Sequence, residues 1–587
     1  MDKFITLISI LTSLLIPILI SPLTRADFIS LTGAETAPNI AEIEILNNHL
    51  HISLEISAAD AGTFWPELPS TKSIYEIARL AQTQKEFAIE VYSPDGKIEP
   101  TTTSIRIAER KPRNSPFAGK TDPRTGVRMP DFPSDKTIIL ANLEFPIKGL
   151  TNLEIRPPLD TDGTASVTIG FTSQHGHTPV SSFHYLSQAE PLKIDWKDPW
   201  NTQFENQNIN RHNRHPLRSF LYVEPRQIRH EILLRPRDLL QWTDQSFNAW
   251  QPLTIKRRKQ LQETAEKFLL RKNPTTIDQT PVEPVSTETV FLKANNTGFT
   301  TVKEHESIEM GSLLIGYREK YPIKELPQSV TIDWKLFTES INSVPTLIQD
   351  PAGPFPTHVM PDFPDIQWRN YLYDYRAPNS DPVPVESTIA AIPMAVLFSF
   401  CFAVFFILTL RSKRVETKNK HPILFYSIVI ICAVPIYYAL PSELRIPLPG
   451  TINKKELKEI TETLLVRLSA AYEEPQSEEL KVQLANLVSR ERFSYTVQNL
   501  SQIYQPLTSS GNKGSIRSIR DLEIEHADQT VVNGNKTFRI VGKWHSYIED
   551  YSWGQMEQLP RETRASIEIT QSDNYWKISA FTPLSIR

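Results

Sequence analysis

Residues 388–410 read TIAAIPMAVLFSFCFAVFFILTL, an apolar run that no charged residue interrupts. A helix needs about 20 apolar residues to cross a hydrocarbon core of about 30 Å. A second apolar run, PILFYSIVIICAVPIYYAL, follows at residues 422–440. The two runs predict a pair of transmembrane helices, and this prediction organises the interpretation of the rest of the chain.

The segment between the runs, residues 411–421, is basic, with one acidic residue, Glu416, against Arg411, Lys413, Arg414, Lys418 and Lys420. Short basic loops remain in the cytoplasm, so both large flanking regions are expected on the opposite side. Residues 1–26 combine a positive start, an apolar stretch and a small-residue end, which is typical of a signal peptide, with an uncleaved anchor as the alternative. The predicted location is a bacterial inner membrane with both soluble regions outside the cytoplasm.

Composition excludes several classes of function. The 587 residues have a formal net charge of −4, without the basic stripe that a nucleic-acid partner requires. The only cysteines, Cys401 and Cys432, lie inside the apolar runs, so the soluble regions contain no disulfide and no cysteine-ligated zinc. Exported domains without cysteine are more typical of a bacterial periplasm than of a eukaryotic secretory route.

Alternation of apolar and polar residues predicts strands through most of the region before the apolar runs. Two alternating segments flank Asn47-Asn48, a pair that tolerates the left-handed turn of a hairpin. Further strands are expected near residues 87–92, 103–108, 137–143, 153–155 and 166–171. We therefore predict a β-sandwich-like domain at residues 27–200. A second β-rich domain is predicted at 201–350, with one helix at 255–270.

Two short echoes raise the question of a repeat. Phe145-Pro146-Ile147-Lys148-Gly149-Leu150 returns as Tyr321-Pro322-Ile323-Lys324-Glu325-Leu326, and each copy precedes a predicted strand. The tetrapeptide at residues 194–197, IDWK, also returns at residues 332–335, but at a different spacing. Both echoes cannot mark one period, so the sequence leaves a duplication open.

The pattern changes twice more along the chain. Residues 351–386 are dense in proline, which predicts an extended, semi-rigid linker. After the second apolar run, residues 450–587 show helical spacing of leucines up to Tyr504, followed by four strand candidates. Helices followed by a strand meander predict an α+β domain in which helices cover one face of the sheet.

This order ends in Asn574-Tyr575-Trp576-Lys577-Ile578 and resembles the cystatin-like α+β cone of nuclear-transport-factor-like proteins. The resemblance implies a cone that holds a small ligand, contains a catalytic Asp/His pair or serves as an interaction surface. Residues 183–187 (FHYLS) and 192–200 (LKIDWKDPW) resemble bacterial membrane-anchored exported proteins of uncharacterised function. Some of these resemble the exported domain of hydrogenase/urease accessory permeases. That resemblance implies a β-rich exported domain and carries no activity over to this chain.

The familiar catalytic motifs are missing from the sequence. It contains no Gly-x-Ser-x-Gly elbow, no His-Glu-x-x-His run and no phosphate-binding glycine loop. Histidine provides the one suggestive pattern. His49/His51 and His175/His177 have the spacing that places two rings on one strand face, where they could bind a metal, with His184, His212 and His215 following. The alternative is a solvent face for His49 and His51 and a loop for His175 and His177. The same alternation places His545 on a solvent face of the C-terminal domain.

We therefore predict no catalytic, cofactor-binding or metal-binding residue and no cofactor. The leading hypothesis is a non-enzymatic, membrane-anchored envelope protein whose exported domains carry interaction or assembly surfaces for an envelope protein partner. The alternatives are a periplasmic metal-handling accessory protein and a C-terminal cone that binds a ligand or catalyses a reaction.

Overall fold

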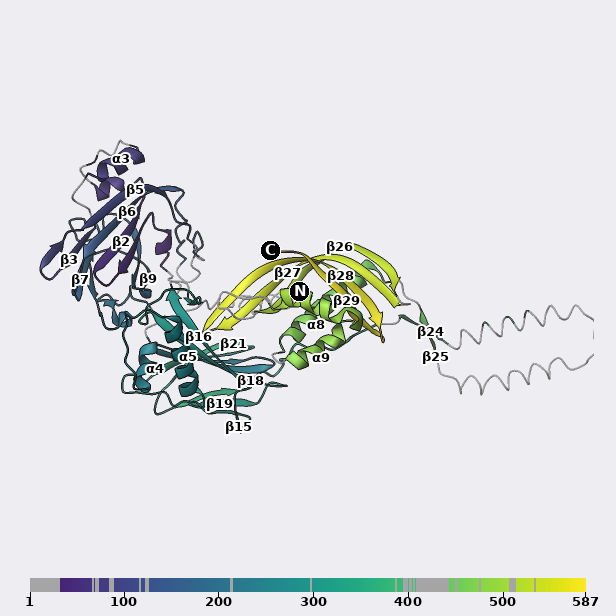
Figure 1. The fold of residues 1–587 in the computed structure, drawn as a ribbon. Coiled ribbons are helices and arrows are strands. Elements are labelled where there is room, and N and C mark those ends of the chain that lie inside the picture. The colour runs from purple at the N-terminus through teal and green to yellow at the C-terminus, as the bar shows by residue number, and fades with distance from the viewer. Residues whose placement is uncertain are drawn as a thin grey trace, which may run out of the picture.

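The computed structural model describes residues 32–65, 68, 73–83, 89–113, 115, 118–121, 126–211, 215–295, 298–385, 388–393, 400, 404, 407, 443–448, 452–474, 477–505, 514–532 and 535–587. The described chain is dominated by strands, and most of them gather into three successive units, each with its own hydrophobic core. Figure 1 shows the units in chain order, from the purple first unit through the teal second unit to the green and yellow C-terminal unit.

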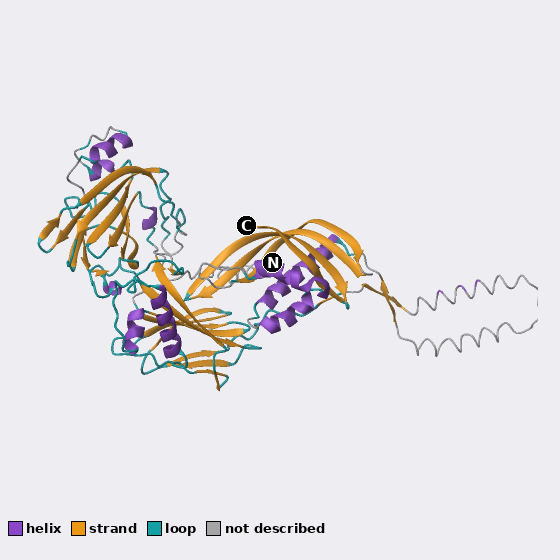
Figure 2. Ribbon diagram, in the orientation of Figure 1, coloured by secondary structure: helices purple, strands orange, loops and turns teal. Residues whose placement is uncertain are grey.

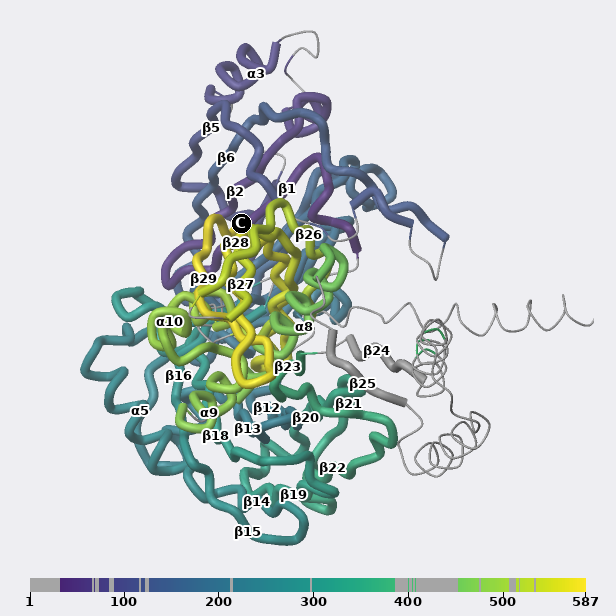
Figure 3. The backbone as a smooth tube through the Cα atoms, turned by 90° about the vertical axis from the view of Figure 1, so that its right-hand side faces the viewer, coloured from purple at the N-terminus to yellow at the C-terminus, as the bar shows by residue number. Residues whose placement is uncertain are grey.

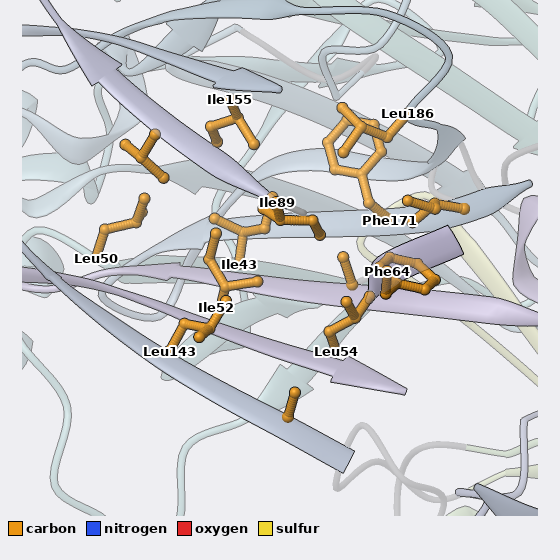
Figure 4. Packing of buried hydrophobic residues seen from close by; sticks show 14 of the residues in the cluster. Ile43, Leu50, Ile52, Leu54, Phe64, Ile89, Leu143, Ile155, Phe171 and Leu186 are labelled. Carbon is orange, nitrogen blue, oxygen red and sulfur yellow. The ribbon is translucent and has the colours of Figure 1, made fainter. Parts of the chain in front are cut away.

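The first unit packs two sheets around one core. One sheet consists of β1 (Asn39–Ile45), β2 (His49–Ile56), β5 (Thr102–Glu109), β6 (Thr137–Pro146), β8 (Ile169–His175) and β9 (Thr178–Tyr185). The other consists of β3 (Glu90–Ser93), β4 (Gly96–Ile98), β7 (Asn152–Arg156), β10 (Glu190–Lys193) and β11 (Gln203–Phe204). β1 and β2 form the hairpin predicted around Asn47-Asn48, with Ile45 opposite Leu50. Figure 4 shows Ile43, Ile52 and Leu143 of the first sheet in one core with Ile155 of the other sheet.

The second unit again packs two sheets. The larger consists of β12 (Leu217–Val223), β13 (Gln227–Leu234), β16 (Ser286–Asn295), β17 (Gly298–Thr301), β18 (Leu313–Pro322), β20 (Val344–Asp350) and β21 (Gly353–Val359). The smaller consists of β14 (Thr275–Ile277), β15 (Thr280–Val282), β19 (Ser329–Asp333) and β22 (Asp365–Arg369). Helices α4 (Pro236–Trp242) and α5 (Ile255–Leu269) precede β14, and α5 occupies the position of the predicted helix.

The two units share one topology. The strand order β5-β6-β2-β1-β8-β9 of the first unit corresponds to β16-β18-β13-β12-β20-β21 of the second, and β10-β7-β3-β4 corresponds to β22-β19-β14-β15. Even the parallel pairing of β1 with β8 returns between β12 and β20. The echo marks equivalent places, because Pro146 pairs with His49 and Pro322 with Gln227, the first residues of β2 and β13. The structure thus answers the open question with a duplicated fold.

The second echo has no such meaning. Residues 194–197 follow β10, whereas residues 332–335 begin within β19. Because β10 corresponds to β22 and not to β19, the two copies lie at non-equivalent places. This explains why their spacing disagrees with that of the first echo.

The C-terminal unit contains three helices and then four long strands, in the order that the sequence predicts. The helices are α8 (Lys454–Tyr472), α9 (Ser477–Leu487) and α10 (Phe493–Tyr504), and the strands are β26 (Ser515–Val532), β27 (Asn535–Ser552), β28 (Gln555–Ser572) and β29 (Tyr575–Ile586). β23 (Val383–Pro384) adds a fifth strand beside β29. The strands curve around the helices, whose leucines fill the concave side (Figures 1 and 3).

The prediction of two transmembrane helices needs correction. The first six residues of the apolar run form a strand, β24 (Thr388–Pro393), which pairs antiparallel with β25 (Glu443–Leu448). Both segments contain isoleucine and proline, residues that favour extended backbone over helix. Among the described residues, no helix is both long and apolar enough to cross a membrane. The predicted helix at 388–410 is therefore wrong at its start, while residues 1–26, 411–421 and 422–440 lie outside the described residues.

The proline-rich stretch at 351–386 also differs from the predicted linker. It contributes β21, β22 and β23 to three different sheets. β21 and β23, which contain the prolines, are edge strands, where proline is tolerated because one side of the backbone needs no hydrogen-bond partner. Proline density therefore marked edge strands, in addition to the connection that follows β22.

The close packing inside the first unit predicts that a side chain added at one glycine, Gly170, will destabilise the unit. At Gly170 in β8, an added Cβ would lie 2.0 Å from the carbonyl oxygen of Ala34. We expect Gly170→Ala to lower the free energy of unfolding of the first unit by about 1–3 kcal/mol, as overpacking does. Chemical denaturation measures this. At Gly62 in α2 (Ala61–Phe64) an added Cβ meets nothing within 4 Å, so Gly62→Ala is the matched control, and equal destabilisation by both would contradict the packing argument.

Candidate interaction site at the joint of the second and C-terminal units

The hairpin of β27 and β28 reaches from the C-terminal unit to the second unit. Its two strands run in unbroken register from Thr537 opposite Thr570 to Ser552 opposite Gln555. The turn residues Trp553 and Gly554 both have positive φ, 56° and 74°, which produces the tight two-residue turn that matches strand twist. In Figure 1 the yellow hairpin extends toward β16 of the second unit.

The tip enters an apolar socket on the larger sheet of the second unit. Trp553 is only 2 % exposed, and it shares a buried cluster with Phe220, Tyr222, Leu233, Leu292, Ala294, Phe299 and Leu314. On β13, His230 and Ile232 point into the main core of the second unit. Successive residues of a strand point to opposite faces, so the socket residues lie on the sheet face that points away from that core. Burial of a Trp side chain of this size contributes several kcal/mol.

Two glycines allow the close approach. A Cβ at Gly316 would lie 2.5 Å from Cη2 of Trp553, and a Cβ at Gly554 would lie 2.3 Å from Cε1 of Phe220. Any side chain at either position would displace an aromatic ring of the joint. The two surfaces are therefore fitted to each other from both sides.

A buried carboxylate lies at the centre of the socket. Glu231 is fully buried; its Oε1 accepts a hydrogen bond from Nε of Arg318 at 2.6 Å, and its Oε2 accepts one from the backbone N–H of Trp553 at 2.7 Å. The Arg318 guanidinium lies 5.0 Å from the centre of the Trp553 ring. The hairpin tip thus completes the hydrogen bonding of an ion pair that the second unit buries.

Further polar contacts surround this centre. The N–H of Gly554 donates to the hydroxyl of Tyr222 at 2.8 Å, and Arg229 donates to the carbonyl oxygen of Tyr551. Burial alone would lower the pKa of Arg229, but the carboxylates of Glu224 and Glu231 outweigh it and raise that pKa above its usual value. Burial raises the pKa of Tyr222 well above its usual value, so its hydroxyl remains protonated.

The duplicated first unit provides an internal comparison for this face. Equal strand lengths and registers align β1 and β2 with β12 and β13, so that Phe220 and Tyr222 replace Glu42 and Glu44, and Glu231 replaces Ser53. The first unit covers its polar face with its own chain, where Arg113 pairs with Glu55 at 2.8 Å. At these aligned positions aromatic residues occur in the unit that receives the hairpin and charged residues in the other, which indicates that this face of the second unit is a docking surface.

The same alignment reveals a buried polar chain in the second core. Ser219, His230 and Glu319 replace Ala41, Ile52 and Leu143 on three adjacent strands. The Ser219 hydroxyl lies 3.0 Å from Nε2 of His230, and Nδ1 of His230 lies 3.6 Å from Oε2 of Glu319. The order resembles a nucleophile, base and acid, but all three are at most 2 % exposed beneath Trp334. A nucleophile must touch its substrate, so this network is structural in the observed conformation.

The histidine pair 175/177 lies at the joint between the first and second units. His175 is buried, with Nδ1 2.8 Å from the Thr202 hydroxyl and its ring against Trp196 and Trp250. His177 lies across the turn, where its Nδ1 is 2.7 Å from Oε2 of Glu309 in the second unit. The left-handed Gly176 between them sends the rings in different directions. The pair therefore joins two units and does not offer two imidazoles to one metal.

The other predicted histidines are dispersed. His51 lies 3.7 Å from Glu44 on the polar face of the first unit, where His49 is also half-buried, and His184 is buried in β9. His215 is stacked near His358, and His212 lies outside the described residues. His545 is exposed between Asp521 and Glu562, on the face opposite Trp544, as the alternation predicts. Among the described residues, no group of His, Cys, Asp and Glu could hold a metal ion.

A cleft opens beside the hairpin joint. It has a volume of about 760 Å³, and both units line it, with Arg226, Lys324 and Leu326 on one wall and Glu479, Val482 and Gln483 on the other. Lys324 and Leu326 belong to the echo segment, and Val482 is 68 % exposed. The cleft therefore lies between the two units that the hairpin joint connects.

Sequence reasoning missed the hairpin joint. Glu231 and Arg318 are spread over two strands, and Trp553 lies more than 200 residues further along. The available signal was the replacement of polar residues by Phe220 and Tyr222 at equivalent places of the repeat, which the echo could have revealed. Comparison of the sequence with protein-family models gives no match, and comparison with curated proteins gives no significant match. Function must therefore be argued from the geometry of the joints and the cleft.

Replacing Trp553 in the socket should strongly weaken the joint between the second and C-terminal units. We expect Trp553→Ala to destabilise the joint by about 3–5 kcal/mol, because it empties the socket and removes the ring from Arg318. Small-angle scattering should then show a larger radius of gyration, and proteolysis should cut faster in residues 370–382. Tyr575→Ala, at a position 39 % exposed, is the control. An unchanged radius of gyration for Trp553→Ala would contradict the docking role.

His175 and His177 should make the free energy of unfolding depend on pH in opposite directions. Burial lowers the pKa of His175 to about 4. As the pH falls from about 6.5, only the unfolded chain therefore binds a proton at this histidine, and the free energy of unfolding falls by up to about 3 kcal/mol. The hydrogen bond to Glu309 raises the pKa of His177. The stability that protonated His177 adds to the folded protein is therefore lost as the pH rises above about 6.5. Unfolding measured across pH should show a flatter acid limb for His175→Gln and a flatter alkaline limb for His177→Gln. The reverse assignment would disprove this account.

Proposed function

We propose that the chain is a non-enzymatic envelope protein that presents interaction or assembly surfaces outside the cytoplasm. The observation that carries the proposal is the hairpin joint, in which the C-terminal unit completes a buried ion pair of the second unit. Separating the units would take the Trp553 N–H away from the buried carboxylate of Glu231 and expose the Trp553 ring, so the joint favours a single arrangement of the units. A fixed arrangement suits a protein that holds partners at a set distance.

The joint between the first and second units supports the same function. Trp250 donates its indole N–H to the carbonyl oxygen of Trp196 at 2.9 Å, and the buried Asp198 accepts hydrogen bonds from Arg235 and Arg237. Trp196 and Asp198 belong to the segment LKIDWKDPW. Its aromatic and turn residues therefore connect the first unit to the second, which accounts for them without any catalytic role.

The cleft beside the hairpin joint is the proposed partner surface. Its volume lies within the range of ligand sites, and such sites occur preferentially between domains. Apolar Leu326, Leu372 and Val482 alternate there with charged groups, as at the rim and core of protein interfaces. The exported location rests on the predicted signal peptide and on the lack of cysteine elsewhere than positions 401 and 432.

A photo-crosslinking residue tests this proposal in cells. Placed at Val482, it should give one discrete adduct with an envelope protein, because Val482 lines the cleft. Val531 is the matched control, since both valines are 68 % exposed but only Val482 borders the cleft. Trp553→Ala should abolish the Val482 adduct by separating the walls. Equal adducts at both valines, or an adduct that survives Trp553→Ala, would reject the cleft as the partner surface.

A further inference from the structure

One side of the first unit's sandwich is closed by a segment that the second unit lacks. In the first unit, β11 extends the smaller sheet beside β10, and the chain then crosses to the larger sheet, where Asn210 pairs with Ser181 of β9. We call residues 203–211 the closing segment. The smaller sheet of the second unit ends at β22, which corresponds to β10. Among the described residues, the second unit therefore has nothing in the place of the closing segment.

Two side chains of the closing segment seal the first unit. Phe204 is 0 % exposed, and the centre of its ring lies 5.6 Å from that of Phe171 in the core. Arg211 donates from its backbone N–H to the carbonyl oxygen of Val180 at 3.0 Å, and from Nη1 to the carbonyl oxygen of Pro179 at 2.8 Å. Every residue of β9 is accordingly buried or half-buried.

The corresponding strand of the second unit, β21, is open to solvent. Pro354 pairs with Gln349 near the start of β21. Pro179 pairs with Gln174 at the same place in β9, so the two prolines are equivalent. Residues 354–358 of β21 are nevertheless all exposed. The carbonyl oxygen of Pro354 thus points out of the sheet edge like that of Pro179, but no described side chain donates a hydrogen bond to it.

A half-exposed aromatic residue marks the gap between the two sheets. Phe355 lies opposite Ile348 and shares a sheet face with Val359, and both of these residues belong to the core of the second unit. Phe355 itself is 49 % exposed, although its side chain is on the inner face of the sandwich. The sandwich is therefore open beside Phe355, which offers an apolar contact to a segment that enters between the sheet edges.

The outer edge of β22 can pair with such a segment. Toward β19, the N–H of Asn370 donates to the carbonyl oxygen of Gln328 at 2.9 Å. Backbone groups of successive residues alternate in direction along a strand, so those of Asp365, Gln367 and Arg369 point to the open edge. Unpaired N–H and carbonyl groups along a strand edge are a template for one more strand. Strand addition of this kind is a common mode of peptide recognition.

We propose that an extended segment of a partner protein closes the second unit, pairing antiparallel with β22 as β11 pairs with β10. This segment carries a large apolar side chain that covers Phe355 and an arginine that donates to the carbonyl oxygen of Pro354. The partner is a different protein, because Phe204 and Arg211 of a second copy are already buried in that copy's own first unit. The site lies outside the hairpin joint and the cleft, so it does not rest on the proposed function.

A peptide with the sequence of residues 201–211, NTQFENQNINR, probes the site on the full-length protein. The peptide should slow amide hydrogen exchange at residues 365–369. β15, at the opposite edge of the same sheet, is the matched control strand, and its exchange should stay unchanged. Peptides with Phe204→Ala or Arg211→Ala should bind at least tenfold more weakly, because each removes one of the two contacts that seal the first unit.

Substitutions in the protein separate this site from other surfaces. Gln367→Pro removes an N–H that points to the open edge, where proline is tolerated, so the protein should fold and its affinity for the peptide should fall at least tenfold. Phe355→Ser should weaken binding similarly, whereas Val285→Ser, at a position of the second unit that is 74 % exposed, should not.

Three results would overturn the proposal. The first is a lack of protection at residues 365–369 at millimolar peptide, and the second is equal affinity of all three protein variants for the peptide. The third is a dimer of the protein that Gln367→Pro dissolves, because a second copy would then be the occupant.

Discussion

The carboxylate of Glu231 is the constraint on which the arrangement of the second and C-terminal units depends. It is buried on the face of a sheet, and burying a charge is costly unless hydrogen bonds and an opposite charge replace the lost water. Arg318 supplies the opposite charge from the adjacent strand. The second oxygen is satisfied by the backbone N–H of Trp553, from a different unit. Both oxygens of the buried Glu231 carboxylate therefore have hydrogen-bond donors only when the hairpin is docked.

The duplication shows how this dependence arose in physical terms. Both units share a topology in which the inner faces pack together, and the outer face of the larger sheet must be hydrated or covered. The first unit covers it with charged residues of its own chain, such as Arg113 over Glu42 and Glu55. The second unit has aromatic residues on this face, which would be an exposed apolar patch without the hairpin.

Much of the local structure could be predicted, because it follows from residues close together in the sequence. The β1/β2 hairpin, helix α5 and the C-terminal order of helices and strands were all recognisable from alternation, helical spacing and turn residues. The site was less predictable. His175 and His177 were noticed for metal spacing, but the left-handed turn at Gly176 separates their rings and gives each a role in joining units. Spacing fixes a shared face only if the backbone stays extended through both residues.

The sequence by itself determined the hairpin of β1 and β2, helix α5 and the C-terminal order of helices and strands, since a period of two or of about 3.6 is a property of a single segment. It also contained the echo at residues 145–150 and 321–326, which marks the repeat. Only the tertiary structure decided that the repeat is a duplicated fold, that residues 388–393 pair as a strand with residues 443–448, and that Trp553 completes the ion pair of Glu231 and Arg318. The physical reason is that these are pairings between distant segments, and no single segment carries the complementary shape and charge of its partner.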